Sequence, residues 1–258
     1  LLKTLDKYDV IILTSTPYDQ VQNFYVDYRL AYTFSLINKV KKRYPDKDVV
    51  LCGSHGTVRH DLVFDRCNID IIIKGEYEQA IPIVVEALAN KNSLSEVPNI
   101  VYKEEGKIIE SSITKKPDEL LFNFDRYPDY DKIEMSRYFG DGYWNNMPYR
   151  ELNWGVIQGS RGCPYKCSFC YKFWGNKFRK RQPESIVGEM QLLNEKYFIN
   201  NLFFIDYTFT YDKKWVLSIC DLILKNALKI NWTIETRIDK LDEEIVKNLS
   251  ISGCKNIW

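Results

Sequence analysis

The sequence lacks an apolar stretch long enough to cross a bilayer. Its longest apolar runs, such as Val10 to Leu13 and Ile69 to Ile73, are broken by charge and far shorter than the roughly 20 residues that a membrane helix requires. It also lacks an excess of either charge, because 36 basic residues balance 35 acidic residues. We therefore predict no membrane partner, and the absence of a basic excess argues against nucleic acid as a partner.

Targeting signals are absent from the first residues, which carry no initiator methionine, basic n-region or cleavage site. We expect a piece of a longer protein without a signal peptide. Seven cysteines, three of them within eight residues, do not suit the disulfide framework of a secreted protein and favour a cytoplasmic location. Apolar residues make up 45% and charged residues 28% of the sequence, a balance typical of globular domains with a buried core.

Residues 1 to 112 alternate short β-branched runs with amphipathic stretches, and this rhythm predicts a parallel sheet with crossover helices. A small-residue loop, Gly53-Ser54-His55-Gly56, follows the second expected strand and would let a ligand approach the backbone closely. The expected elements are strands at 8–14, 48–52 and 69–74, helices at 27–44, 61–66 and 77–90, and a terminal hairpin that pairs 99–102 with 107–110.

Residues 113 to 152 differ in composition, since prolines, aromatic residues and Asp/Asn clusters without a sustained period predict a connector. A second α/β rhythm occupies residues 153 to 258 and predicts part of a (β/α) barrel, in which functional groups lie at the carboxyl ends of the strands. The expected strands are 154–158, 201–206, 231–235 and 254–258, and the expected helices are 183–197, 213–228 and 242–250.

Three cysteines, Cys163, Cys167 and Cys170, follow the first strand of this second half with Cys-x3-Cys-x2-Cys spacing. Three thiolates on one loop can bind three corners of an iron–sulfur cubane and leave the fourth iron open. Zinc is the rival metal, but structural zinc sites use four ligands and the two histidines lie in the first half of the chain. A third reading, buried cysteines packed as small hydrophobes, conflicts with the polar neighbours of these residues.

This segment, Gly159-Ser160-Arg161-Gly162-Cys163-Pro164-Tyr165-Lys166-Cys167-Ser168-Phe169-Cys170, resembles the cluster-binding loop of the radical S-adenosylmethionine (SAM) superfamily. The resemblance implies that the three cysteines hold a [4Fe–4S] cluster whose open iron chelates the methionine part of SAM. An electron passed to the sulfonium then releases a 5′-deoxyadenosyl radical. By position, Phe169 would pack beside the adenine.

Further SAM contacts are implied at the ends of later strands. The segment from Phe203 to Thr210 resembles the Asp-x-x-Phe-Thr form of a second family motif, in which Asp206 would accept a hydrogen bond from the methionine ammonium. The alternative is that Asp206 merely ends a strand before a helix cap. Glu235 and Arg237 end the third strand, where the family has polar residues facing the cofactor, although an exposed ion pair explains them equally well.

The first half resembles the cobalamin-binding domain that precedes many radical SAM domains. The family forms Gly-Gly-Pro-His and Gly-Glu-Gly-Glu correspond here to segments starting at Gly53 and Gly75, with Ser54 in place of proline and Tyr77 in place of glycine. The loop that carries a cobalt-ligating histidine in the family has no counterpart in this sequence. The resemblance implies these cobalamin contacts: Ser15, Thr16, Gly53, Ser54, His55, Gly75 and Glu76.

The expected fold class is therefore α/β, with an incomplete Rossmann-like cobalamin-binding domain followed by a partial (β/α) radical SAM barrel. The implied activity is methylation of an unactivated carbon, with oxidative cyclisation of the porphyrin ester cyclase type and a non-enzymatic iron–sulfur module as alternatives. The implied partners are a small-molecule or peptide substrate and an electron donor such as flavodoxin or ferredoxin. The sequence does not identify the substrate.

Overall fold

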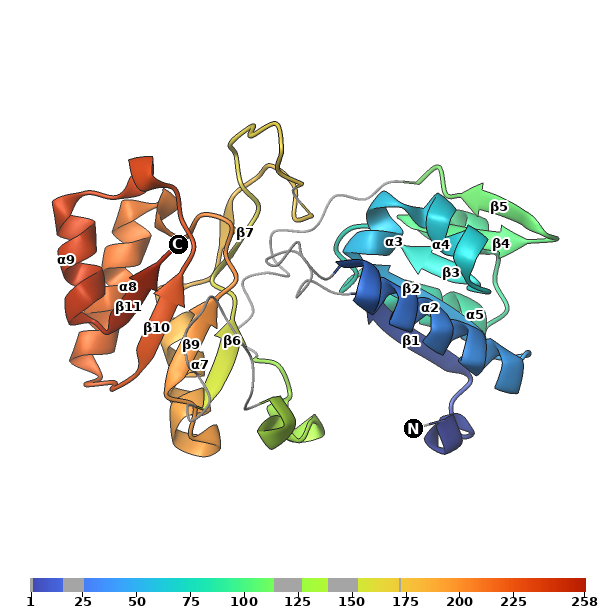
Figure 1. The fold of residues 1–258 in the computed structure, drawn as a ribbon, viewed down its shortest axis with the longest axis horizontal. Helices are drawn as coiled ribbons and strands as arrows, with labels where there is room; N and C mark the ends of the chain where they lie inside the picture. Colours follow the sequence, from blue (N-terminus) through green and yellow to red (C-terminus); the bar gives the residue numbers. More distant parts are fainter. Residues whose placement is uncertain (1, 16–25, 114–126, 139–152, 172) are drawn as a thin grey trace. The chain divides into compact units, whose positions relative to one another are not determined.

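The structure is a computed structural model that describes residues 2–15, 26–113, 127–138, 153–171 and 173–258. The chain divides into two compact units, Leu1–Pro117 and Asp118–Trp258 (Figure 1). Most of the connector expected at residues 113 to 152 lies outside the described residues. Within the described ranges, no helix is both long and apolar enough to cross a membrane.

The first unit contains one five-stranded sheet in which the strands follow chain order. The first three strands run parallel, while the last two form an antiparallel hairpin on the edge of the third. The hairpin turns through Glu105 and Gly106, both at positive φ, a geometry that matches the twist of the paired strands. The strands are β1 (Val10–Ser15), β2 (Asp48–Gly53), β3 (Ile71–Ile73), β4 (Ile100–Glu104) and β5 (Lys107–Glu110).

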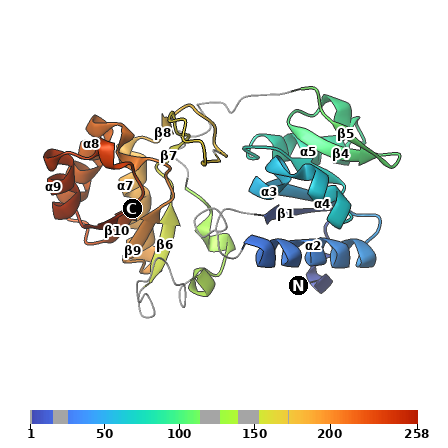
Figure 2. The ribbon, with the colours of Figure 1, turned by 45° about the horizontal axis from the view of Figure 1, so that its top comes forward.

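Side chains of β2 alternate between two cores, one on each face of this sheet. Val49 and Leu51 pack with α2 and α4, whereas Val50 and Cys52 pack with α5. The unit therefore has three layers, with helices on both faces, as a doubly wound sheet requires (Figure 2). Its helices are α2 (Val26–Arg43), α3 (Ser54–Val58), α4 (His60–Arg66) and α5 (Ala80–Ala89), with the short 3₁₀ helices η1 (Leu2–Leu5) and η2 (Leu94–Glu96).

The second unit contains a four-stranded parallel sheet in the order β11-β10-β9-β6. One helix follows each of the first three strands in sequence. A proline starts α7, and the carboxylates of Asp212 and Asp242 cap the first turns of α8 and α9. The strands are β6 (Trp154–Ile157), β9 (Asn201–Phe204), β10 (Asn231–Ile234) and β11 (Cys254–Ile257), and the helices are α7 (Pro183–Tyr197), α8 (Lys213–Lys225) and α9 (Glu243–Ile251).

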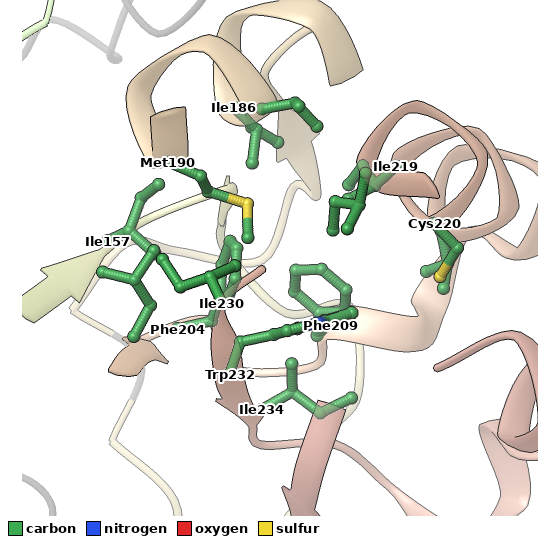
Figure 3. Close-up of a cluster of buried hydrophobic side chains, with 14 of the residues drawn as sticks. Ile157, Ile186, Met190, Phe204, Phe209, Ile219, Cys220, Ile230, Trp232 and Ile234 are labelled. Carbon is green, nitrogen blue, oxygen red and sulfur yellow. The ribbon is translucent and has the colours of Figure 1, made fainter. Parts of the chain in front are cut away.

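The core of this unit lies between the sheet and its three helices (Figure 3). Phe204, Phe209 and Trp232 stack edge to face or tilted at its centre, with ring centroids 4.7 to 5.7 Å apart. The indole N–H of Trp232 donates to the carbonyl of Ser252 over 3.0 Å, so its one polar atom is satisfied. The core thus fixes the segments that follow β9 and β10.

The α/β fold class predicted from the sequence is confirmed, and α7 has the bounds expected for it. One local expectation is wrong and the bounds of one strand differ. Ser54, His55 and Gly56 do not form a loop but begin the short helix α3 directly after β2. The strand expected at 69–74 is present but shorter, because Ile71, Ile72 and Ile73 are the residues that pair with β4, and the first two also pair with β2. Two further strands, β7 (Ser160–Arg161) and β8 (Arg179–Lys180), were not expected.

Replacing Trp232 by alanine is expected to destabilise the second unit by about 3–5 kcal/mol, because it removes a fully buried aromatic side chain and leaves a cavity. Urea unfolding followed by far-UV circular dichroism measures this loss. Val246→Ala, which truncates an exposed side chain on α9, serves as the control. Equal unfolding midpoints for the two variants would contradict the assignment of Trp232 to the core.

Candidate iron–sulfur and SAM site

The three cysteines lie on a loop whose two ends are paired. Strands β7 and β8 run antiparallel, with Ser160 opposite Lys180 and Arg161 opposite Arg179. Inside this ribbon the Cys163 N–H donates to the carbonyl of Gly175 over 3.1 Å. The loop therefore leaves the carboxyl end of β6 and returns to the same place before α7 begins.

Gly162, immediately before the first cysteine, has a φ of 81°. A Cβ at this position would overlap the carbonyl oxygen of Lys177 on the returning arm of the loop. Gly175 has a similar φ of 74°, but a Cβ there would meet nothing within 4 Å. Close approach of the two arms therefore requires glycine at 162 and not at 175.

A buried ion pair holds the chain where the loop ends. The Arg181 guanidinium donates to the Glu189 carboxylate on α7, to the Gln158 carbonyl at 3.0 Å and to the Ser185 hydroxyl at 3.0 Å. The Tyr130 hydroxyl donates to the other Glu189 oxygen at 2.6 Å. Because both charged groups are buried and hydrogen-bonded, the contact joins the end of β6 to α7 in a defined geometry.

The three cysteine side chains differ in exposure. Cys163 is buried with its Sγ 3.5 Å from Thr208 Oγ1, Cys167 is half-buried with its Sγ 3.6 Å from Arg237 Nη1, and Cys170 is exposed. Across the described ranges no three Cys, His, Asp or Glu side chains converge closely enough to hold a metal ion. The three thiols therefore lie on one loop, but their sulfur atoms do not converge on a common point. As a donor set of sulfur alone, they fit iron–sulfur chemistry.

Asp206 lies directly after β9 and is completely buried. Its Oδ2 accepts the Gly159 N–H at 2.9 Å, and its Oδ1 accepts the Ser160 hydroxyl. Burial raises the pKa of this carboxyl to about 7, partly offset by these hydrogen bonds. Both oxygens thus face the base of the cysteine loop. The contact with the methionine ammonium that the sequence suggested stays a prediction.

Arg237, which follows β10, lies over the Tyr165 ring with its Cζ 4.0 Å from the centroid, and its Nε donates to Asp239 at 2.9 Å. Burial raises the pKa of Glu235 to about 7. Phe169 projects from the loop with 92% of its surface exposed. The structure therefore brings Arg237 to the cysteine loop, where its guanidinium contacts both a thiol and an aromatic ring.

Tyr207 and Thr208 were not among the expected site residues. The Tyr207 hydroxyl accepts the Phe173 N–H at 3.0 Å, and its ring lies 4.7 Å from the Trp174 ring. The Thr208 hydroxyl lies beside Cys163. Both residues fall inside the segment from Phe203 to Thr210 in which Asp206 was predicted as a site residue. The same motif could therefore have indicated Tyr207 and Thr208.

Polar groups also gather at the carboxyl ends of β1 and β2 in the first unit. The Ser15 hydroxyl donates to the Cys52 carbonyl at 3.3 Å, and the Ser54 hydroxyl donates to the Ser15 carbonyl at 3.5 Å. His55 Nδ1 lies 3.3 Å from the same Ser15 carbonyl oxygen. Three of the residues expected to contact cobalamin thus meet at one edge of the sheet.

Thr57 links this group to the end of β3. Its hydroxyl donates to the Gly53 carbonyl at 2.7 Å and accepts the Gly75 N–H at 2.9 Å. Gly75 has a φ of 70°, and a Cβ there would meet nothing within 4 Å, so the backbone is open beside Glu76. Thr16, the remaining residue expected here, lies outside the described residues.

Comparison with known proteins identifies relatives of this chain. Residues 157–257 match the family model described as the Radical SAM superfamily. An uncharacterized methyltransferase of Pyrococcus horikoshii is 32% identical over 215 residues, which are 81% of this chain and 44% of that protein. The anaerobic magnesium-protoporphyrin IX monomethyl ester cyclase of Rubrivivax gelatinosus is 28% identical over 231 residues, 85% of this chain and 39% of that protein. The chain thus spans less than half the length of these relatives.

A solved structure resembles nearly the whole chain. The radical SAM methyltransferase TsrM of Kitasatospora setae, with cobalamin and a [4Fe–4S] cluster bound, has a TM-score of 0.71 and 16% identity, covering 99% of this chain and 51% of that one. At this identity the likeness shows the fold alone.

Fold and site together define an α/β protein with a three-cysteine loop at the carboxyl edge of a parallel sheet. The chain belongs to the radical SAM superfamily, and residues 157–257 are its matching domain. The resemblance recognised in the cysteine loop is thereby confirmed.

Gly162→Ala is expected to disrupt the cysteine loop, whereas Gly175→Ala, at similar φ but without the overlap, costs only the left-handed strain of about 1–2 kcal/mol. The measurement is iron bound per chain after anaerobic reconstitution, with the unfolding midpoint recorded for each variant. Comparison of the two variants separates the effect of the steric overlap at residue 162 from the effect of left-handed backbone strain, which both variants share. Equal iron binding by both variants would show that the close approach of the two arms is dispensable.

The raised pKa of Asp206 predicts a pH dependence of stability. Burial lifts the pKa of this carboxyl from the ordinary 3.8 to about 7, so the folded state retains a proton that the unfolded chain releases. The free energy of unfolding should fall as pH rises from about 4 to about 7 and then level off. Asp206→Asn should show a shallower decline in urea titrations across this range. Identical slopes would mean that the carboxyl titrates normally.

Proposed function

We propose that the protein is a cobalamin-dependent radical SAM methyltransferase that acts on an unactivated carbon. The observation that carries the proposal is the three-cysteine loop held at the carboxyl edge of a parallel sheet in a radical SAM domain. The similarity to the Pyrococcus horikoshii methyltransferase supports methyl transfer. The fold shared with TsrM, whose structure contains cobalamin, supports the cofactor set.

Cys163, Cys167 and Cys170 would hold the [4Fe–4S] cluster. When bound, this cluster supplies the electron for reductive cleavage of SAM, the start of radical chemistry. The chain's own contribution is to hold the three sulfurs on a closed loop and to place the Arg237 guanidinium beside Cys167. A positive charge at 3.6 Å favours a negatively charged ligand at this position.

SAM would be oriented by residues around the loop. Phe169 offers an exposed aromatic face on which a purine can stack. Glu235, with its pKa near 7, is partly ionised at neutral pH and offers a carboxylate to an ammonium group. Arg237 adds a guanidinium suited to a carboxylate. Asp206 is the remaining candidate for the ammonium, although its two oxygens already accept hydrogen bonds from the loop.

Cobalamin would bind at the carboxyl edge of the first sheet. Ser15, Ser54 and His55 gather there, and the open backbone at Gly75 leaves room for a ligand. Ligands of open parallel sheets bind outside the carboxyl ends of the strands, which is where these residues lie. Thr16, Gly53 and Glu76 complete the proposed set.

The substrate is proposed to be a small molecule or a peptide, and the electron donor a flavodoxin or ferredoxin. A cluster that oxygen damages suits the reducing cytoplasm, where we place the protein. Oxidative cyclisation is the second candidate function. It is supported by the similarity to the Rubrivivax gelatinosus cyclase over 85% of this chain.

Anaerobic reconstitution is expected to give a brown protein with about four irons and four sulfides per chain. On reduction this protein should convert SAM to 5′-deoxyadenosine, and with methylcobalamin it should transfer a methyl group when its substrate is present. Cys167→Ala should lose cluster and cleavage, because only two loop thiols remain. Cys67→Ala, which removes a buried cysteine in the first unit, is the matched control.

A colourless zinc protein, or SAM cleavage retained by Cys167→Ala, would overturn the cluster assignment. SAM cleavage by a full-length protein that binds no cobalamin would exclude the cobalamin-dependent methyltransferase. A product with a new carbon–carbon bond and no added methyl group would favour the cyclase.

A further inference from the structure

Three consecutive residues after β9 contact the cysteine loop at three separate points. Asp206 contacts its entrance, where the Gly159 N–H donates to Oδ2 at 2.9 Å and the Ser160 hydroxyl donates to Oδ1. Because a carboxyl group accepts both donors, it fixes the direction in which the chain leaves β6.

Thr208 and Tyr207 contact the loop further along. The Thr208 Oγ1 lies 3.5 Å from the Sγ of Cys163, the first cysteine. The Tyr207 hydroxyl accepts the Phe173 N–H at 3.0 Å, three residues beyond Cys170, and its ring packs on Trp174. The contacts of residues 206 to 208 therefore bracket the three cysteines in sequence, from Gly159 to Phe173.

The segment that makes these contacts is itself fixed to the core. Phe209 is fully buried among Phe204 and Trp232, and its N–H donates to the Glu235 carbonyl at 3.0 Å. The Thr210 and Thr236 hydroxyls lie 2.6 Å apart in a second link to the segment after β10. Asp206 and Thr208 have no exposed surface. A rigid, buried support thus contacts a loop that carries partly exposed thiols.

We propose that Asp206, Tyr207 and Thr208 form a clamp that positions the cysteine loop for the cluster, a role that rests on the proposed function. They are positioning residues: Asp206 acts on the thiols through Gly159 and Ser160, and Tyr207 acts through Phe173. Fixing the loop at its entrance, at Cys163 and at Phe173 reduces the conformational entropy lost when three thiols converge on one cluster. The clamp therefore slows loss of the cluster.

This assignment differs from a direct contact between Asp206 and SAM. Both Asp206 oxygens accept hydrogen bonds from the loop, and the side chain is completely buried. A residue that binds only SAM leaves cluster retention unchanged in the absence of SAM. A residue of the clamp changes cluster retention before SAM is added, and the two roles are separable by experiment.

The test uses Tyr207→Phe, which keeps the ring packing and removes only the hydroxyl, and Asp206→Asn, which keeps the size and removes one acceptor. The rate at which a chelator extracts iron from each reconstituted protein is measured without SAM. We expect about fivefold faster extraction for Tyr207→Phe, as for one lost hydrogen bond, and a larger increase for Asp206→Asn. Tyr211→Phe is the control, because the described contacts of Tyr211 with the loop are ring packing on Tyr165 and Phe178.

A second readout needs no cluster. In the metal-free protein, hydrogen exchange at the Phe173 amide should accelerate in Tyr207→Phe and stay unchanged in Tyr211→Phe. The clamp would be overturned if Tyr207→Phe and Asp206→Asn both lost iron to the chelator and exchanged amide hydrogens at wild-type rates. It would also be overturned if these variants bound SAM more weakly but retained the cluster normally. If the wild-type protein takes up no cluster, the proposed function fails, and the amide exchange still decides whether the clamp exists.

Discussion

The hydrogen bonds from Gly159 and Ser160 to the buried Asp206 carboxyl join the ends of two adjacent parallel strands. Backbone pairing aligns β6 with β9 but leaves the chain beyond each strand free to turn in many directions. A carboxyl group with no access to water must find its partners inside the protein, and here it finds them at the first residues of the cysteine loop. The position of the loop relative to the sheet depends on this contact.

The other end of the loop is fixed by a different kind of interaction. Arg181 donates at once to the end of β6, to Ser185 and to Glu189, so a single guanidinium joins strand, ribbon and helix. The five donors of arginine in a rigid plane suit this task, which the single ammonium of lysine would not match. Between the two anchors, glycine at 162 lets the arms approach closely. The loop is thus constrained by its surroundings more than by its own sequence.

The regular helices and strands could be predicted because their side chains alternate between two environments with a fixed period along the element. Helix α7 begins with a proline and has an amphipathic period, and its bounds were predicted as found. Strands β7 and β8 have only two residues each, too few for a period, and they pair across the loop. The three cysteines were evident from spacing alone. The contacts of Tyr207 with Phe173 join residues 34 positions apart, which no local pattern reveals.

The solvent exposure of the three cysteines increases along the loop. Cys163 is covered and Cys170 faces solvent, with Cys167 between them. Dissolved oxidants therefore reach the last thiol first, and sulfenic acid or a mixed disulfide at Cys170 would block one corner of the site while the covered thiol stays reduced. Thiol reductants reverse both of these modifications, whereas further oxidation of Cys170 to sulfinic or sulfonic acid would block this corner permanently.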